Sequence, residues 1–150
     1  HLIAATPNNE VNSLAAREFQ HRFGKANIWQ LTPPDVDAHH QKAVANHMRG
    51  RFCFLGGPRF TELSTFVRNG AEMKKTLLTE VFTLEDYKLT HGENAIILFK
   101  ETEDNVLSPV LSDTEKFEDP ITIHALVIEK DAIETKALKK KEAADAKVVP

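Results

Sequence analysis

Cysteine is almost absent from this chain, which has 150 residues and a single thiol at Cys53. One cysteine excludes a disulfide within the chain and any zinc site built from several thiolates. Cys53 lies in the apolar run "GRFCFL", where we expect a buried, unreactive thiol rather than a nucleophile. The scarcity of cysteine fits a cytoplasmic protein.

Long apolar runs and an excess of positive charge are also missing. No uncharged segment approaches the roughly 18 to 20 apolar residues that a membrane span needs. The start of the chain lacks the basic and apolar regions of a signal peptide. The formal net charge is -3, so no overall positive field favours a nucleic acid. We therefore expect no membrane helix and no nucleic-acid partner.

The common catalytic motifs are absent as well: G-x-G-x-x-G, the P-loop, G-x-S-x-G and H-E-x-x-H. The closest phosphate-like segment, "LGGPRF", predicts a turn. Glu80, Glu85 and Asp86 lie near the start of a predicted helix, where acidic side chains are favoured by the helix dipole. We expect these acids, and His124 on a predicted strand, to be structural. A small hydrolase that uses Glu80 or Asp86 with a histidine is the alternative.

The first 32 residues predict a strand, a helix and a second strand. Leu2–Thr6 is a short apolar strand, Pro7 ends it, and Asn8 or Asn9 caps the helix. Gly24 ends that helix, and "ANIWQL" is the second strand, expected to be parallel to the first. The helix face that we expect to pack on the sheet consists of Val11, Leu14, Ala15, Phe19 and Phe23.

The rest of the chain divides by composition. Residues 33–49, which include "TPPDVDAHH", predict a linker, and residues 50–129 predict about five strands and two short helices, with helix caps at Thr61 and Thr83. Residues 130–150 are charged and predict a flexible tail. The expected fold class is α/β then α+β: a partial Rossmann-like βαβ unit over residues 1–32, followed by a small mixed α+β module.

A candidate ligand site lies where the first strand ends. In an open parallel sheet, ligands bind beyond the carboxyl ends of the strands. Thr6, Pro7, Asn8 and Asn9 occupy that position, ahead of a helix whose free N–H groups suit an anion. These four residues are the candidate cofactor contacts. The alternative is a helix start that binds nothing.

A second candidate is the only histidine cluster, His39, His40 and His47. His40 and His47 would share one face of a helix, so a metal sensor is an alternative function. The simpler interpretation is a solvated linker.

Two segments resemble known families. "LIAATPNNEVNSLAAREFQHRFGKANIWQL" resembles the second half of the nucleotide-binding domains of Trk-type potassium-uptake regulators and potassium-conductance regulators. "RGRF", "LTEVF" followed by Tyr87, and "GENAIILF" resemble the carboxyl-terminal cytosolic region of bacterial cation:proton antiporters of the sodium/proton exchanger kind. Together they cover about residues 2–129. The matching residues of the first segment are Ala5, Thr6, Asn9, Glu10, Asn12, Leu14, Ala15, Ala16 and Gly24.

The resemblance implies a non-catalytic, ligand-sensing regulatory domain on the cytoplasmic face of the cell membrane. We accordingly expect a fragment of a larger protein, with the transporter domain of the same polypeptide as its partner. Exposed sheet edges and an apolar helix face would also favour a homodimer. The intact domain would bind NAD or an adenine nucleotide, with only Thr6, Pro7, Asn8 and Asn9 carried over here. This chain lacks the glycine-rich loop and the acidic ribose-binding position, so we expect no tight nucleotide binding. A fragment of a dehydrogenase-like enzyme is the alternative.

Overall fold

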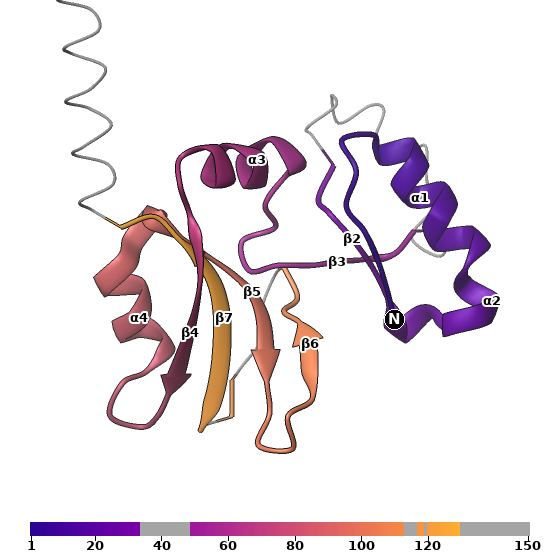
Figure 1. The fold of residues 1–150 in the computed structure, drawn as a ribbon. Helices are drawn as coiled ribbons and strands as arrows, with labels where there is room; N and C mark the ends of the chain where they lie inside the picture. Colours follow the sequence, from indigo (N-terminus) through magenta and orange to yellow (C-terminus); the bar gives the residue numbers. More distant parts are fainter. Residues whose placement is uncertain (34–48, 113–116, 119, 130–150) are drawn as a thin grey trace, which may run out of the picture.

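The computed structural model describes residues 1–33, 49–112, 117–118 and 120–129 (Figure 1). Within them lie a three-stranded parallel sheet, in the order β1-β2-β3, and a four-stranded antiparallel sheet, in the order β4-β7-β5-β6. The predicted fold class, α/β followed by α+β, is therefore confirmed. Most of the predicted linker and the whole predicted tail lie outside the described residues.

The parallel sheet begins with the predicted strand, helix and strand. Leu2 lies opposite Ile28, and the two strands run in the same direction, as expected. The helical connection ends at Gly24, whose φ of +75° a residue with a side chain would rarely adopt. The elements of this connection and its strands are β1 (Leu2–Ala4), α1 (Asn9–Glu18), α2 (Gln20–Phe23), η1 (Lys25–Asn27) and β2 (Ile28–Gln30).

A third strand completes this sheet from beyond the predicted linker. β3 (Arg51–Phe52) pairs with β2 in parallel, with Trp29 opposite Arg51. The sequence pattern assigns Arg51 and Phe52 to the α+β module instead. The chain therefore returns to the first sheet before it builds the second.

The buried face of α1 differs from the predicted one. Val11, Leu14 and Phe19 remain 48%, 55% and 39% exposed, whereas the residues that α1 buries are Asn12, Ser13 and Ala16. Each strand of this sheet is only two or three residues long, so the sheet covers a narrow part of the helix. Hydrogen bonds from Asn12 to the preceding loop hold the small-residue face against the sheet. The prediction is therefore wrong for Val11, Leu14 and Phe19, whereas Ala15 and Phe23 are half-buried.

The antiparallel sheet is close to the prediction. β7 lies between β4 and β5, and its residues alternate between buried and half-buried. Pro109 lies on the edge strand β6, where its missing N–H costs no ladder hydrogen bond. The elements of this part are α3 (Phe60–Arg68), β4 (Glu72–Leu78), α4 (Leu84–His91), η4 (Gly92–Asn94), β5 (Ala95–Glu101), β6 (Leu107–Pro109) and β7 (Ile121–Val127).

The two short helices begin in different ways. Thr83 caps α4 as predicted, and Asp86 completes a reciprocal capping box with it. Thr61 does not cap α3, because that helix already begins at Phe60, with Arg59 as its cap residue and Glu62 accepting from the Arg59 N–H. The Thr61 prediction is wrong because Thr61 lies inside the first turn of the helix, one residue after its start.

The segment after β3 joins the two sheets. Phe54 N donates to Val110 O at 2.6 Å, and Leu55 N donates to Ile97 O at 3.0 Å. An apolar cluster fills the space around this junction and consists of Trp29, Leu31, Cys53, Phe54 and Leu98. A second cluster packs α4 against the antiparallel sheet and consists of Leu78, Tyr87, Ile97, Val110, Ile121, Ile123, Ala125 and Val127.

Candidate functional site

The loop after β1 is held to α1 by one buried amide. Asn12 is 3% exposed, and its Oδ1 accepts from Thr6 N at 3.0 Å and from Thr6 Oγ1 at 2.7 Å. Its Nδ2 donates to Thr6 O at 3.0 Å. Three hydrogen bonds thus fix the position of Thr6 relative to the helix that follows.

Asn8 is the helix cap, which settles the choice between Asn8 and Asn9. Its Oδ1 accepts from Glu10 N at 2.9 Å and from Val11 N at 3.2 Å. These two N–H groups are therefore already satisfied by the protein and are not free for an anion.

Asn9 belongs to a second series of hydrogen bonds. Its Oδ1 accepts from Gln30 Nε2 at 3.5 Å, and Gln30 Oε1 accepts from Gly50 N at 2.9 Å. Gln30 is 1% exposed at the end of β2. These hydrogen bonds therefore link Asn9, at the start of α1, to Gly50, which precedes β3. The sequence analysis did not single out Asn12 or Gln30 as site residues. The signal that could have identified them is that each is a polar residue within an otherwise apolar segment.

The structure thus brings the four predicted contacts together at the carboxyl end of β1. Thr6, Pro7 and Asn8 are exposed, and Asn9 is half-buried. Protein donors contact both side-chain carbonyl oxygens, whereas the side-chain N–H donors of Asn8 and Asn9 are turned to no protein acceptor in these bonds and are candidate ligand contacts. The loop contains no cation, and the adjacent charged residue is Glu10, so an anion would bind here only weakly.

Of the three acids Glu80, Glu85 and Asp86, Asp86 has a structural role in the capping box of α4. The pKa of Asp86 is lowered by hydrogen bonds from the backbone N–H and then the hydroxyl of Thr83. Glu80 and Glu85 are exposed. The cluster therefore contributes a helix cap, as expected from its position.

His124 makes the polar contact that the sequence predicted. Its Nε2 lies 2.7 Å from Glu101 Oε2, and Lys75 Nζ lies 2.9 Å from the same oxygen. The pKa of Glu101 is lowered, mainly by the hydrogen bond from Lys75 and then by that from His124. These residues belong to three adjacent strands, β4, β7 and β5, and tie one face of the sheet together.

Cys53 is buried, as predicted. It is 0% exposed, and desolvation raises the pKa of its thiol to about 12. The "LGGPRF" segment forms a turn, with φ of +80° at Gly56 and +62° at Gly57.

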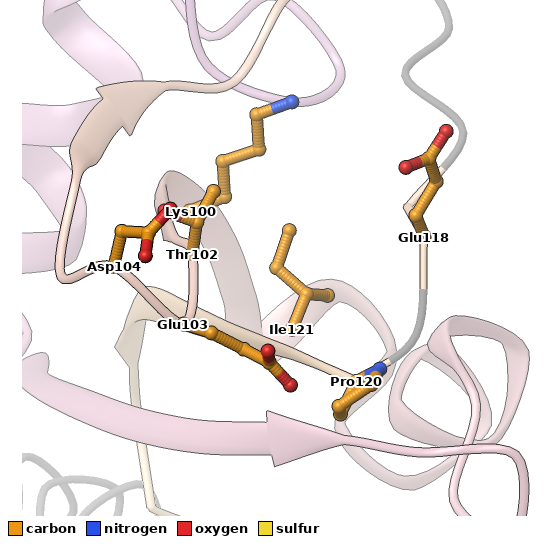
Figure 2. Close-up of a pocket in the computed structure, with 7 residues that line it drawn as sticks. All are labelled: Lys100, Thr102, Glu103, Asp104, Glu118, Pro120 and Ile121. Carbon is orange, nitrogen blue, oxygen red and sulfur yellow. The ribbon is translucent and has the colours of Figure 1, made fainter.

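Three cavities of similar size are lined by residues between Leu55 and Glu129. One, of about 540 Å³, is lined by three acids, of which Glu103 and Glu118 point to different sides in Figure 2. The others, of about 550 and 570 Å³, lie against α4. No group of three metal-ligating side chains is present among the residues that the structure describes. The predicted cluster of His39, His40 and His47 lies outside those residues.

Comparison with protein-family models, curated proteins and solved structures finds no match for this chain. The helices that the structure describes are all too short or too polar to span a lipid bilayer.

Proposed function

We propose that this chain is a non-catalytic, ligand-sensing regulatory module of a membrane cation:proton antiporter, acting at the cytoplasmic face of the membrane. The resemblance of residues 2–129 to regulator and antiporter sequences is the starting point. The fold supports the proposal, because a parallel strand–helix–strand unit is joined through a shared apolar cluster to an antiparallel module.

One observation carries the proposal: α1 connects the loop after β1 to an exposed apolar face. At its amino-terminal end, Asn12 holds Thr6 through three hydrogen bonds. On the side away from the sheet, Val11 and Leu14 are 48% and 55% exposed. A ligand that prefers one position of the loop would therefore shift the surface that a partner contacts. Such a ligand acts through its different affinities for the two states.

The partner surface is proposed to bind a second copy of the chain or the transporter domain of the same polypeptide. Leu14→Glu places a charge on this face without disturbing a buried residue, and Leu89→Glu is the matched control on α4, where Leu89 is 84% exposed. In sedimentation equilibrium we expect the unmodified chain and Leu89→Glu to self-associate, and Leu14→Glu to shift toward monomer. A chain that stays monomeric at every concentration would rule out the homodimer.

The ligand is proposed to be NAD or an adenine nucleotide that contacts Thr6, Pro7, Asn8 and Asn9. A thermal-shift screen with NAD, NADH, ATP, ADP, AMP and cyclic dinucleotides tests this. A ligand at about 100 times its dissociation constant adds roughly 2.7 kcal/mol to the folded state. Asn8→Asp keeps the capping oxygen but removes the free N–H donor, so it should abolish the shift without loss of stability. A shift that survives in Asn8→Asp would place the ligand elsewhere.

The antiporter assignment is tested in the longer polypeptide that the proposal implies. Proton flux driven by sodium or potassium is measured in everted membrane vesicles, with unmodified protein, Leu14→Glu and Leu89→Glu at matched amounts. We expect only Leu14→Glu to change the flux. Equal flux from all three would count against a regulatory role for this face.

A further inference from the structure

A cavity of about 550 Å³ lies between α4 and the Leu55–Gly57 turn that follows β3. This volume falls within the roughly 300 to 1,000 Å³ typical of small-molecule sites. Apolar side chains from the turn and from β5 line one side of it, namely those of Leu55, Ala95 and Ile97. The space is large enough for a ring-sized ligand and has an apolar surface to receive it.

Two aromatic rings of α4 also line this cavity. The centroids of Tyr87 and His91 are 4.4 Å apart, and their planes are tilted by 42°. Tyr87 is 1% exposed, so its ring is fixed by the core around it. Its hydroxyl is buried and has no hydrogen-bond partner among the described residues. Fixed aromatic surfaces favour a flat ligand.

The charge around this cavity is positive. Lys88 lies on its rim, and no acidic side chain is among the described residues that line it. Lys88 forms no ion pair with any residue that the structure describes. In the neighbouring cavity, by contrast, Lys74 is paired with Glu129 at 2.8 Å and Lys75 with Glu101 at 2.9 Å. An uncommitted ammonium group beside an apolar cavity favours an anion.

We propose that this cavity binds a small organic anion with a flat apolar body. The apolar side chains and the His91 ring, which Tyr87 supports from the core, receive the body, and the Lys88 ammonium receives the negative group. This site is separate from the loop after β1 and does not rest on the function proposed for that loop.

The position of the cavity gives its ligand a structural effect. The turn that lines it is bonded to the antiparallel sheet, since Leu55 N donates to Ile97 O and Gly56 N donates to Ser112 O at 3.1 Å. The same turn lies close to the segment that follows β2, because a side chain at Gly57 would lie 2.8 Å from Thr32 Oγ1. A bound ligand therefore contacts the segment through which the two sheets meet.

Phenyl phosphate is a suitable probe, because it joins a flat ring to an anionic group. It is titrated into the full-length ¹⁵N-labelled chain, and the amide signals of Gly56, Gly92 and Ser112 are followed by NMR. We expect saturable shifts at these residues. Inorganic phosphate and benzyl alcohol, which each lack one half of the probe, should produce much weaker shifts at the same concentration.

Two variants, with one control, test the charged and the apolar side of the cavity separately. Lys88→Gln should weaken phenyl phosphate binding by about three- to tenfold, the usual effect of losing one partly exposed charged contact. Lys25→Gln makes the same change of charge in η1, which follows α2, and α2 lies far from α4 in Figure 1; this variant should bind as the unmodified chain does. Ala95→Leu fills the apolar side and should abolish binding; if that variant fails to fold, Lys88→Gln alone decides. Equal affinity in Lys88→Gln and Lys25→Gln, or shifts confined to other residues, would overturn the proposal.

Discussion

The hydrogen bonds between Asn12 and Thr6 make a quantitative prediction. Asn12→Ala removes the side chain that accepts from Thr6 N and Oγ1 and donates to Thr6 O. It leaves the helix backbone intact, because alanine is a strong helix former. The change therefore isolates the attachment of the loop to α1.

The expected loss of stability is about 2 kcal/mol. Three hydrogen bonds at about 0.5 to 1.5 kcal/mol each give roughly 1.5 to 4.5 kcal/mol. The lower half of that range applies, because Thr6 is exposed and water can replace part of what Asn12 supplied. The higher helix propensity of alanine returns about 0.6 kcal/mol.

Urea unfolding measures this loss. The only tryptophan, Trp29, is 5% exposed in β2, so its fluorescence reports on the parallel sheet, while circular dichroism reports on the whole chain. Glu18→Ala is the control, since Glu18 is exposed on the same helix and its replacement should change stability by less than about 0.5 kcal/mol. A similarly small loss for Asn12→Ala, with an unchanged denaturant slope, would refute the inferred attachment of the loop.

Three further predictions follow from burial and charge. Cys53 should resist alkylation at neutral pH in the folded chain, because it is inaccessible and its pKa is raised to about 12, and should react readily in urea, as mass spectrometry can show. Leu78→Ala should cost about 2 to 5 kcal/mol in urea unfolding, whereas Leu77→Ala, its neighbour on the opposite face of β4 at 56% exposure, should cost far less; similar losses would contradict the register. Asp86 and Glu101 have lowered pKa values in the folded state, so the stability they contribute is present above about pH 4 and is lost as the pH falls through their folded values. Asp86→Asn with Glu101→Gln should flatten the acid side of the stability profile, and an unchanged profile would contradict these shifts.

Local chemistry made much of the fold predictable. The capping oxygen of Asn8, the capping hydroxyl of Thr83 and the edge position of Pro109 each depend on a few adjacent residues. The absence of a side chain permits the positive φ at Gly24 and Gly92. Such features are encoded over a few residues and can therefore be read from the sequence.

Long-range pairing was not predictable in the same way. β3 has only two residues, and nothing in "GRFCFL" distinguishes a strand that joins β2 from one that starts a new sheet. The orientation of α1 was also missed. Helical periodicity shows which apolar residues share a face, but it does not show whether the sheet covers that face. The deciding contacts are polar ones, between Asn12 and Thr6 and between Gln30 and Gly50.

The place of the four candidate residues in the fold was predictable, but not which of their polar atoms are free. The strand-to-helix transition places Thr6–Asn9 at the carboxyl end of β1, as expected. Which of their polar atoms remain free depends on partners far away in the sequence, such as Gln30. The cavity beside α4 combines Leu55, Lys88 and Ile97, and no spacing along the sequence would have joined them.

The short strand β3 limits how this protein can be divided. Seven residues separate its last residue, Phe52, from the start of α3 at Phe60, and that stretch forms the junction between the two sheets. A cut ahead of β3 would deprive the parallel sheet of its third strand, and a cut after it would break the bonds that Phe54 and Leu55 make. The two halves therefore cannot be exchanged between proteins as independent building blocks. A chimera that retains both sheets must inherit residues 51–57 together with each of the surfaces that they touch.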